Sequence, residues 1–238
     1  MTRMKFVFVT LFPEMIEAVV STSILGRARR AGRVDFQTVN PRDFTTDRHR
    51  TVDGSTYGGG PGMLMMVEPL ALALRSLSLT PEDVVILFEP SGTRFRQATA
   101  SRLANSPRII LVCGHYEGID QRIHDEFSTE VLSMGDFVLT GGELPAMTVA
   151  DAVTRLLPEV LGDAQSLVED SHSDGLLSYP QYAKPSEFEG LSVPEVLTSG
   201  DHGKVAQFRR QHQVRTTRTQ RPDLFCQAPL DVSDLDWL

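Results

Sequence analysis

Short apolar runs recur along the first part of the chain and are separated by polar, glycine-bearing segments. Several of these runs are continuous rather than alternating, which is typical of strands that are buried on both faces of a sheet. We predict that each run forms one β-strand. The runs are Lys5–Leu11, Val34–Val39, Val84–Phe88, Ile109–Cys113 and Phe137–Leu139.

Helical spacing occupies the segments between these runs. Pro13–Arg33, Val67–Leu79 and Thr93–Asn105 carry apolar residues three and four positions apart, as the buried face of a helix requires. An alternation of strands and helices predicts an α/β domain with a mostly parallel sheet flanked by helices. Ligands of such sheets bind beyond the carboxyl ends of the strands.

The clearest helical pattern runs from Glu143 to Pro158. Pro145 suits a first turn, and the charge of Glu143 complements the positive end of the helix dipole. Apolar residues cover much of the circumference, so this helix lies either in the core or at an interface between subunits. Arg155 near its end either caps terminal carbonyl groups or stabilises negative charge at a site, and the pattern leaves both readings open.

The composition changes after Gly162 and becomes polar and acidic. We expect residues 1–162 to form one domain, 163–175 to form a linker and 176–238 to form a smaller helical domain. Asp170 is one of several acids in this linker. It is either a solvated residue or a catalytic base, and the sequence alone favours the solvated residue.

Basic residues gather in the last predicted helix, which starts near Gly200, although the chain carries a net charge of −8. Val205, Phe208 and His212 share one face of that helix, so its arginines are expected to face solvent. A basic patch on an acidic protein indicates either a bound polyanion or a solvated helix face, and charge alone leaves both open. The basic residues are Lys204, Arg209, Arg210, Arg215, Arg218 and Arg221.

The composition is that of an ordinary soluble protein, with 238 residues of which 41% are apolar and 23% charged. The apolar stretch within Met1–Phe12 spans only about eight residues, too few to cross a membrane, and no cleavage site follows it. Cys113 and Cys226 are too few for a disulfide-stabilised secreted domain, so we expect two reduced thiols in the cytoplasm. The histidines and cysteines form no tight pair of ligands, so no structural metal site is expected.

Three glycine-bearing loops follow apolar runs: Leu87–Gly92, Cys113–Gly118 and Ser133–Met147. Their spacing matches neither common phosphate-binding motif, and the missing P-loop lysine disfavours a triphosphate ligand. If the loops meet at one edge of the sheet, their backbone groups can bind an adenine and a ribose, so together they predict a small-molecule site. A fourth glycine-rich loop, Thr56–Met65, either contacts a planar base or only bends the chain.

Long motifs in a fixed order make the chain resemble the bacterial tRNA (guanine-N1)-methyltransferases, which belong to the SPOUT class with a trefoil knot. The resemblance covers Met4–Pro222. Phe137, Ser91 and His115 stand where tyrosine, glutamine and arginine occur in other versions of the motifs. The motifs are TLFPEM (Thr10–Met15), Pro41–Met65, LVCGHYEGIDQR (Leu111–Arg122), MGDFVLTGGELPAM (Met134–Met147), RLLPEVLG (Arg155–Gly162) and EDS (Glu169–Ser171).

The resemblance assigns expected roles to individual residues. Asp170 would be the general base and Arg155 the cation near guanine O6. Glu117 would lie near the methionine end of S-adenosylmethionine, where magnesium dependence has been placed, and Mg²⁺ is a further candidate cofactor. The tRNA-binding candidates are Lys204, Arg209, Arg210 and Arg215. The knot would hold S-adenosylmethionine between Leu87, Pro90, Gly92, Gly114, Tyr116, Met134, Gly135, Asp136, Phe137, Val138, Leu139, Gly141 and Gly142.

The resemblance also implies an activity and an assembly. The expected reaction transfers a methyl group from S-adenosylmethionine to N1 of the guanosine immediately 3′ of a tRNA anticodon, which supports reading-frame maintenance. The expected assembly is a homodimer in which the linker of one subunit completes the active site of the other. The alternatives are a knotted methyltransferase that acts on another RNA position and an RNA-binding module without catalysis.

Overall fold

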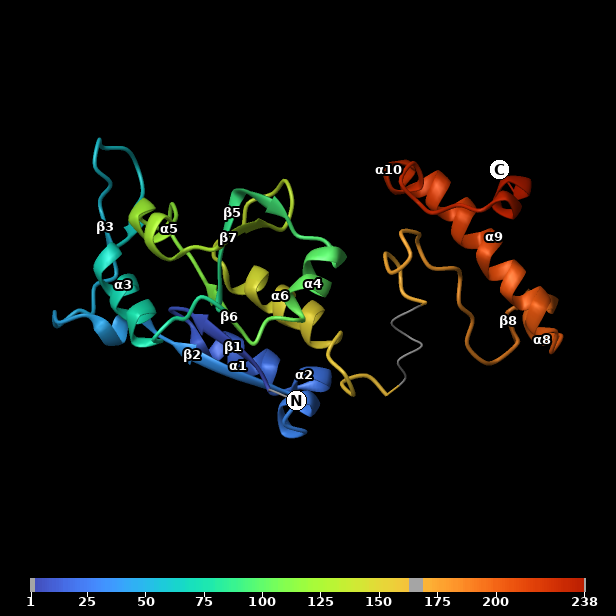
Figure 1. The fold of residues 1–238 in the computed structure, drawn as a ribbon, viewed down its shortest axis with the longest axis horizontal. Helices are drawn as coiled ribbons and strands as arrows, with labels where there is room; N and C mark the ends of the chain where they lie inside the picture. Colours follow the sequence, from blue (N-terminus) through green and yellow to red (C-terminus); the bar gives the residue numbers. More distant parts are fainter. Residues whose placement is uncertain (1–2, 163–168, 238) are drawn as a thin grey trace. The chain divides into compact units, whose positions relative to one another are not determined.

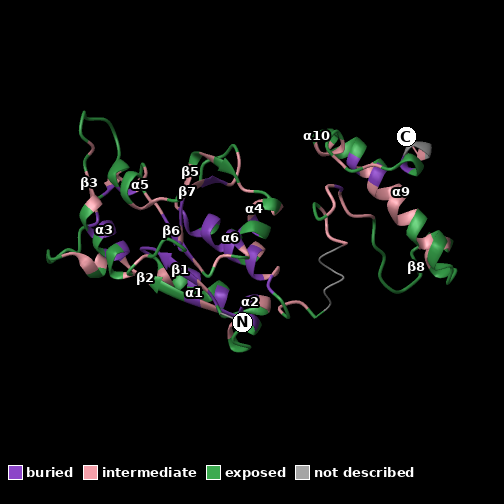
Figure 2. Ribbon diagram, in the orientation of Figure 1, coloured by how far each residue is buried: buried purple, intermediate pink, exposed green. Residues whose placement is uncertain are grey.

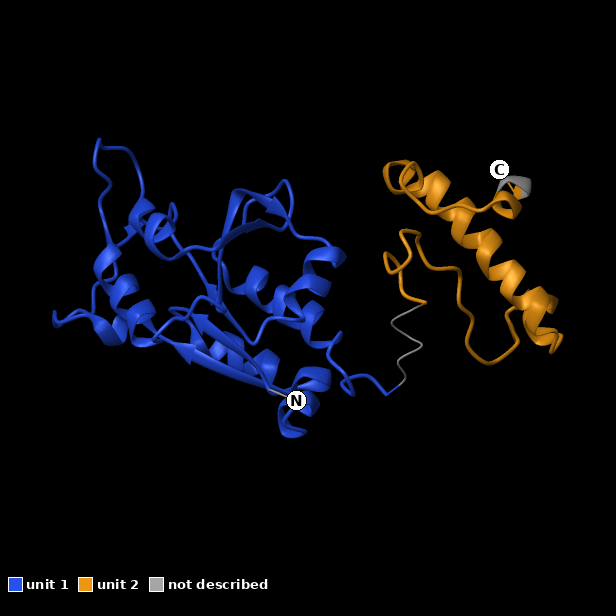
Figure 3. Cartoon of the chain, in the orientation of Figure 1, with its two compact units in different colours: residues 1–162 blue, residues 163–238 orange. Residues whose placement is uncertain are grey.

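The computed structural model describes residues 3–162 and 169–237, except for the side chains of residues 235 and 236. The chain divides into two compact units, Met1–Gly162 and Asp163–Leu238 (Figure 3). Residues 163–168, where the expected linker begins, lie outside the described part. Within the described ranges, no helix combines the length and the apolar character needed to cross a membrane.

A five-stranded parallel sheet forms the centre of the first unit (Figure 1). The strand order is β2-β1-β6-β5-β7, and every neighbouring pair is parallel. This pairing confirms the predicted α/β class with a mostly parallel sheet, and it brings all carboxyl ends to one edge. The strands are β1 (Met4–Val9), β2 (Val34–Val39), β5 (Val84–Arg94), β6 (Arg108–Val112) and β7 (Glu130–Ser133).

Helices cover both faces of this sheet and create two apolar cores. One core joins Phe6 and Phe8 to α1, α2, α4 and α6, and the other joins Val7 and Val9 to α3 and α5. Alternate residues of β1 therefore face opposite cores, as the two-residue period of a strand requires. Buried positions follow the central strands and α6 (Figure 2). The helices are α1 (Pro13–Val20), α2 (Ser23–Arg30), α3 (Val67–Ser76), α4 (Gln97–Leu103), α5 (Gln121–Phe127) and α6 (Glu143–Thr154).

Short elements complete the first unit between β2 and α3. A 3₁₀ helix, η1 (Pro41–Phe44), follows β2, and its start is capped by Asn40, which accepts a hydrogen bond from the Arg42 N–H. The strands β3 (Asp53–Gly54) and β4 (Leu64–Met65) then pair antiparallel. This pair closes the glycine-rich loop that lies between the two strands.

The strand predicted at Phe137–Leu139 is wrong. The fifth strand is β7 (Glu130–Ser133), and Phe137–Leu139 lies in the loop that follows it. The chain leaves the sheet at Gly135, whose φ of +145° few other residues adopt. The apolar run is therefore not buried, and Val138 is 88% exposed. Its apolar character serves a surface or a ligand rather than the core.

The helix predicted over Pro13–Arg33 is two helices in the structure. α1 ends at Val20 and α2 begins at Ser23, which has a φ of +49°. The corner needs close contact, because a Cβ at Gly26 would lie 2.2 Å from the Ser21 carbonyl oxygen. Helical periodicity continued through this corner in the sequence, so it could not reveal the break.

β5 extends beyond the predicted end of the strand at Phe88. Its second part, through Arg94, pairs with β7 after a shift in register, so Thr93 and Arg94 belong to this strand rather than to the following helix. The extension requires glycine at position 92, because a Cβ there would lie 2.6 Å from the Leu132 carbonyl carbon. The first glycine-bearing loop, Leu87–Gly92, therefore lies within β5.

A buried ion pair joins β6 to the turn that precedes β5. Arg108 donates from Nε to Asp83 Oδ1 over 2.7 Å and from a terminal nitrogen to the Leu77 carbonyl oxygen over 3.1 Å. The hydrogen bond from Arg108 is the main cause that lowers the pKa of Asp83. Because the folded-state pKa is lowered, the pair stabilises the fold above the unfolded-state pKa of about 3.9. That contribution is lost as the pH falls through the folded-state pKa.

We expect Asp83→Asn to lower the free energy of unfolding by about 3 kcal/mol at neutral pH, because it leaves a largely buried guanidinium without its carboxylate. Urea unfolding measures this loss, and the difference from the wild type should shrink in acid. The control Asp35→Asn removes a more exposed pair with Arg3 and should cost less than about 1 kcal/mol. Equal costs for both variants would contradict the prediction.

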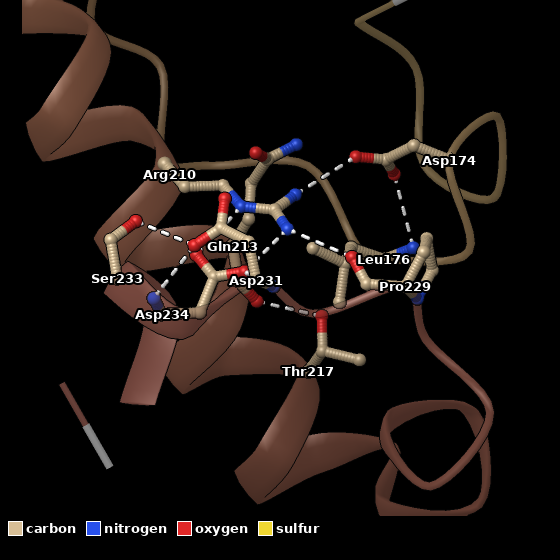
Figure 4. A network of polar contacts seen from close by, with 9 residues as sticks. All are labelled: Asp174, Leu176, Arg210, Gln213, Thr217, Pro229, Asp231, Ser233 and Asp234. Carbon is tan, nitrogen blue, oxygen red and sulfur yellow. Dashed lines mark hydrogen bonds and ion pairs between the residues drawn. The ribbon is translucent and has the colours of Figure 1, made fainter. Parts of the chain in front are cut away.

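The second unit is built around the long helix α9 (His202–Gln220). Asp201 caps its start by accepting a hydrogen bond from the Lys204 N–H over 3.1 Å. The expectation that all its arginines face solvent is wrong for Arg210, which pairs with the buried Asp234 (Figure 4). The other elements are β8 (Glu187–Phe188), β9 (Leu191–Ser192), α8 (Glu195–Thr198), α10 (Pro222–Phe225) and η2 (Val232–Trp237).

Candidate functional site

The three glycine-bearing loops surround one cavity of about 500 Å³ at the carboxyl edge of the sheet. The first loop lies within β5, where the pairing with β7 shifts in register between Phe88 and Thr93, and the other two follow β6 and β7. The parallel pairing places these three strands side by side. Their residues line the cavity together with the start of α6. The lining consists of Phe88, Glu89, Pro90, Ser91, Gly114, His115, Tyr116, Glu117, Gly118, Ile119, Leu132, Ser133, Met134, Gly135, Phe137, Val138, Leu139, Thr140, Gly141, Gly142 and Pro145.

The second loop is fixed to the glycine-rich Thr56–Met65 loop. The Glu117 N–H donates to the Met63 carbonyl oxygen over 2.9 Å, and the Met65 N–H donates to the Gly118 carbonyl oxygen over 3.0 Å. Gly62 has a φ of +89°, which favours glycine, and a Cβ there would lie 2.4 Å from the Glu117 side chain. The Thr56–Met65 loop thus supports the wall of the cavity that carries Glu117.

The third loop lies directly against the second. The Gly142 N–H donates to the Gly114 carbonyl oxygen over 2.9 Å. A Cβ at Gly142 would lie 2.7 Å from Cys113 Cα, and one at Gly141 would lie 2.3 Å from His115 Cε1. The glycines therefore allow two backbone segments to approach more closely than side chains would permit.

A buried polar network supports the contact between the second and third loops. His115 Nε2 lies 2.7 Å from Glu143 Oε2, and Thr10 donates from Oγ1 to Glu143 Oε1 over 2.7 Å. Glu143 and Thr10 are both buried, so the carboxylate needs these partners. Sequence reasoning treated Glu143 only as a helix-dipole residue, since its partner Thr10 lies at the far end of the chain and no spacing connects them.

Two groups near the cavity have shifted pKa values. Partial burial, followed by the charge of the nearby Asp53, raises the pKa of Tyr116. Burial, followed by the charge of Glu143, raises the pKa of Cys113. A buried thiol with a raised pKa is a poor nucleophile.

Most of the residues expected to bind a cofactor lie at the cavity, but three do not line it. Leu87 is buried in the apolar core, and Gly92 packs against the backbone of β7. The Asp136 carboxylate is exposed and pairs with Arg94 over 2.8 Å. The expected residues that do line the cavity are Pro90, Gly114, Tyr116, Glu117, Met134, Gly135, Phe137, Val138, Leu139, Gly141 and Gly142.

The expected base and cation are not part of this lining. Arg155 follows the last residue of α6, where its N–H donates to the Asp151 carbonyl oxygen over 3.1 Å. Asp170 belongs to the second unit, as do the basic residues of α9. In the part of the chain that the structure describes, no group of histidine, cysteine or carboxylate side chains could hold a metal ion.

The charges around the cavity select the kind of ligand. Among the described residues that line it there is no lysine or arginine, whereas Glu89 and Glu117 contribute carboxylates. His124 pairs with Glu89 over 2.8 Å, so Glu117 is the carboxylate with fewer described partners. A cavity of this volume, with glycine backbone and acidic side chains, suits a small ligand with apolar or planar parts and a positive charge.

Comparison with known proteins places these features in a family. Residues 4–227 match the family described as tRNA (guanine-1)-methyltransferase TrmD. A protein of Chloroflexus aggregans named tRNA (guanine-N(1)-)-methyltransferase is 51% identical over 227 residues, covering 94% of this chain and 89% of the relative. A relative of the same name from Bacillus licheniformis is 46% identical and covers 99% of this chain and 98% of its own length. The chain belongs to the tRNA (guanine-1)-methyltransferase family.

Proposed function

We propose that this protein transfers a methyl group from S-adenosylmethionine to N1 of the guanosine immediately 3′ of the anticodon of tRNA. The observation that carries the proposal is the cavity at the carboxyl edge of the sheet, which three glycine-bearing loops enclose without any lysine or arginine among its described lining residues. Relatives that match nearly the whole chain are named for methylation of tRNA guanine N1. Both observations therefore favour RNA methylation over nucleotide hydrolysis as the activity.

S-adenosylmethionine fits the residues that are present. Backbone groups of the second and third loops would bind its adenosine, and the exposed apolar side chains of Phe137 and Leu139 would cover the base. Glu117 would attract the positively charged methionine end. When bound there, S-adenosylmethionine supplies a methyl group on a positively charged sulfur. A divalent cation near Glu117 belongs to the same proposal.

The chemistry at guanine requires a base and a cation. N1 carries a proton at neutral pH, and Asp170 would accept it while N1 forms the new bond to the methyl carbon. The electron pair of the broken carbon–sulfur bond stays on sulfur, so the second product is S-adenosylhomocysteine. Arg155 would stabilise the negative charge that develops on O6. Placing the methyl carbon beside N1 would supply much of the remaining acceleration.

A homodimer and a trefoil knot belong to the same proposal. The exposed apolar residues Met15 and Val19 of α1 and Leu144 of α6 support a subunit interface on these helices. The family to which the chain belongs supports a trefoil knot at these loops. In the dimer, the segment with Asp170 would come from the partner subunit.

We propose that residues 176–238 bind the tRNA, with 163–175 as the connection to the catalytic residues 1–162. Lys204 and Arg215 of α9 are the preferred phosphate contacts. The Lys204 side chain is 72% exposed, and its described ion pair with Asp201 at 3.2 Å lies within the first turn of α9. Such surface pairs contribute little, so the ammonium can exchange its carboxylate for a phosphate.

Transfer of a tritiated methyl group to transcribed tRNAs tests the function. We expect label in tRNAs with guanosine 3′ of the anticodon and at least a hundredfold less when that guanosine is replaced by adenosine, because adenine has no proton at N1 to remove. Mapping of the labelled nucleotide provides the control. Label at another nucleotide would favour a methyltransferase that acts on a different RNA position. If the protein binds tRNA but transfers no label, and calorimetry detects no binding of S-adenosylmethionine, an RNA-binding module without catalysis is favoured.

A further inference from the structure

The segment that carries Asp170 is a compact loop with its own hydrogen bonds. The Ser173 N–H donates to the Asp170 carbonyl oxygen over 3.2 Å, and the His172 N–H donates to the Leu176 carbonyl oxygen over 2.8 Å. His172 has a φ of +73° and Gly175 one of +86°. Such a conformation costs energy at a residue other than glycine and persists only where surrounding contacts impose it. The loop therefore needs anchors outside itself.

The first anchor is Arg210 of α9 (Figure 4). Arg210 donates from a terminal nitrogen to Asp174 Oδ2 over 3.3 Å, while Asp174 Oδ1 accepts a hydrogen bond from the Leu176 N–H over 3.1 Å. The same carboxylate thus joins the guanidinium on the helix to the backbone of the loop.

Arg210 is itself held from the other side by the C-terminal segment. It donates from Nε to Asp234 Oδ1 over 2.9 Å and from a terminal nitrogen to Asp234 Oδ2 over 2.7 Å. A further bond runs to the Pro229 carbonyl oxygen over 3.2 Å. Asp234 is fully buried, and its hydrogen bonds with Arg210 lower the pKa of this carboxyl. The bidentate geometry fixes the plane of the guanidinium, and thereby the donor that faces Asp174.

Two further anchors join the loop to α9. The Leu177 N–H donates to Thr217 Oγ1 over 2.9 Å, and Thr217 is buried. Arg209 lies over the ring of Tyr179 at 4.7 Å and pairs with Glu169 over 3.6 Å. Glu169 directly precedes Asp170 in the chain. Both ends of the loop are therefore fixed to the same helix.

We propose that Arg209 and Arg210 position the Asp170 loop on α9, and that they do not act as phosphate contacts. The proposal rests on the role of Asp170 as the base that the proposed function assigns. In this arrangement α9 provides the phosphate contacts Lys204 and Arg215. Its two adjacent arginines, Arg209 and Arg210, hold the loop that contains the base Asp170. Binding of tRNA along the helix fixes the base relative to the anticodon stem by the same contacts.

The geometry of Arg210 favours positioning over phosphate binding. Its Nε and both terminal nitrogens donate to described protein acceptors, and its side chain is 26% exposed, compared with 72% for Lys204. A phosphate would have to displace the buried carboxylate of Asp234, which would then lack its main partner. A charge committed in this way adds little to the affinity for a polyanion.

The test variant is Asp174→Asn, which removes the charge that Arg210 holds while an amide oxygen can still accept from the Leu176 N–H. We expect amide hydrogen exchange at His172, Leu177 and Ser178 to become about tenfold faster in the free protein. We expect the single-turnover rate of methyl transfer at saturating tRNA and S-adenosylmethionine to fall about tenfold to a hundredfold. The Kd for tRNA should remain unchanged, whereas loss of an acidic residue near a mere phosphate contact would tighten it.

Two further variants complete the experiment. Arg210→Lys keeps the positive charge but cannot hold Asp234 and Asp174 at once, so it should reproduce both effects of Asp174→Asn. Asp174→Glu keeps the carboxylate and should recover part of the rate. The matched control Arg215→Ala should weaken tRNA binding and reduce its salt slope by about one unit, with wild-type exchange in the loop.

Wild-type exchange and wild-type rate in Asp174→Asn and Arg210→Lys would overturn the proposal. A raised Kd for tRNA and a reduced salt slope in Arg210→Lys, with an unchanged saturated rate, would overturn it in favour of phosphate binding. If the wild-type protein methylates no tRNA, the proposed function fails. The exchange data would then still decide whether Arg210 holds the loop.

Discussion

Replacing Asp170 by asparagine is expected to slow methyl transfer about a thousandfold while leaving the affinity for S-adenosylmethionine unchanged. Asparagine has nearly the same shape as aspartate but cannot accept the N1 proton of guanine. The cofactor affinity is expected to persist because the described residues that line the cavity belong to the first unit, whereas Asp170 belongs to the second. Single-turnover transfer of tritiated methyl groups measures the rate, and calorimetry measures the affinity.

The matched control for Asp170→Asn is Asp223→Asn, the same chemical change in the same unit. Asp223 pairs with Arg221 over 2.7 Å, an exposed pair that lowers the pKa of Asp223 to about 2. Its removal should change the rate of methyl transfer less than about twofold, because exposed pairs contribute little. A normal turnover number for Asp170→Asn would remove this residue from the mechanism, even if the protein still methylated tRNA.

Replacing Gly142 by alanine is expected to weaken S-adenosylmethionine binding about tenfold to a hundredfold, the effect of about 1–3 kcal/mol of overpacking. The added Cβ would lie 2.7 Å from Cys113 Cα and 2.9 Å from the Gly114 nitrogen. Both contacts are to backbone, so neither can be relieved by rotation of a side chain. The third loop must move away from the second, and the wall of the cavity moves with it.

The Gly142→Ala substitution tests the contact between the two loops rather than backbone strain, because the backbone conformation at Gly142 is one that alanine adopts. Its φ of −83° and ψ of −4° suit alanine, so the substitution introduces no strained dihedral angle. The control Gly162→Ala adds a methyl group where, among the residues that the structure describes and apart from the chain neighbours, no heavy atom lies within 4 Å, and it should bind S-adenosylmethionine like the wild type. Calorimetry on both variants, with thermal unfolding as a check of folding, compares them. Equal affinities would show that the two loops do not form the cofactor wall.

Local patterns along the chain determined much of the fold. Continuous apolar runs such as Ile109–Cys113 formed buried parallel strands, because a strand covered on both faces needs no alternation. Glycines at the ends of three apolar runs also indicated the loops that meet at the cavity, because close backbone approach favours glycine. The prediction failed at Phe137–Leu139, where apolar residues lie on the surface and the chain has already left the sheet.

Only the tertiary structure decided which polar groups meet. Glu143 bonds to Thr10, which is 133 positions away, and Arg210 is held by Asp234, 24 positions further along the chain. By its place in the sequence, Arg210 belongs to a basic cluster. Its ion pair with Asp234 instead makes Arg210 part of the folded core of contacts in the second unit. Secondary structure and turns follow from short-range sterics and burial patterns that each segment carries in itself. The charge, burial and role of an ionisable side chain depend instead on the groups that folding brings beside it.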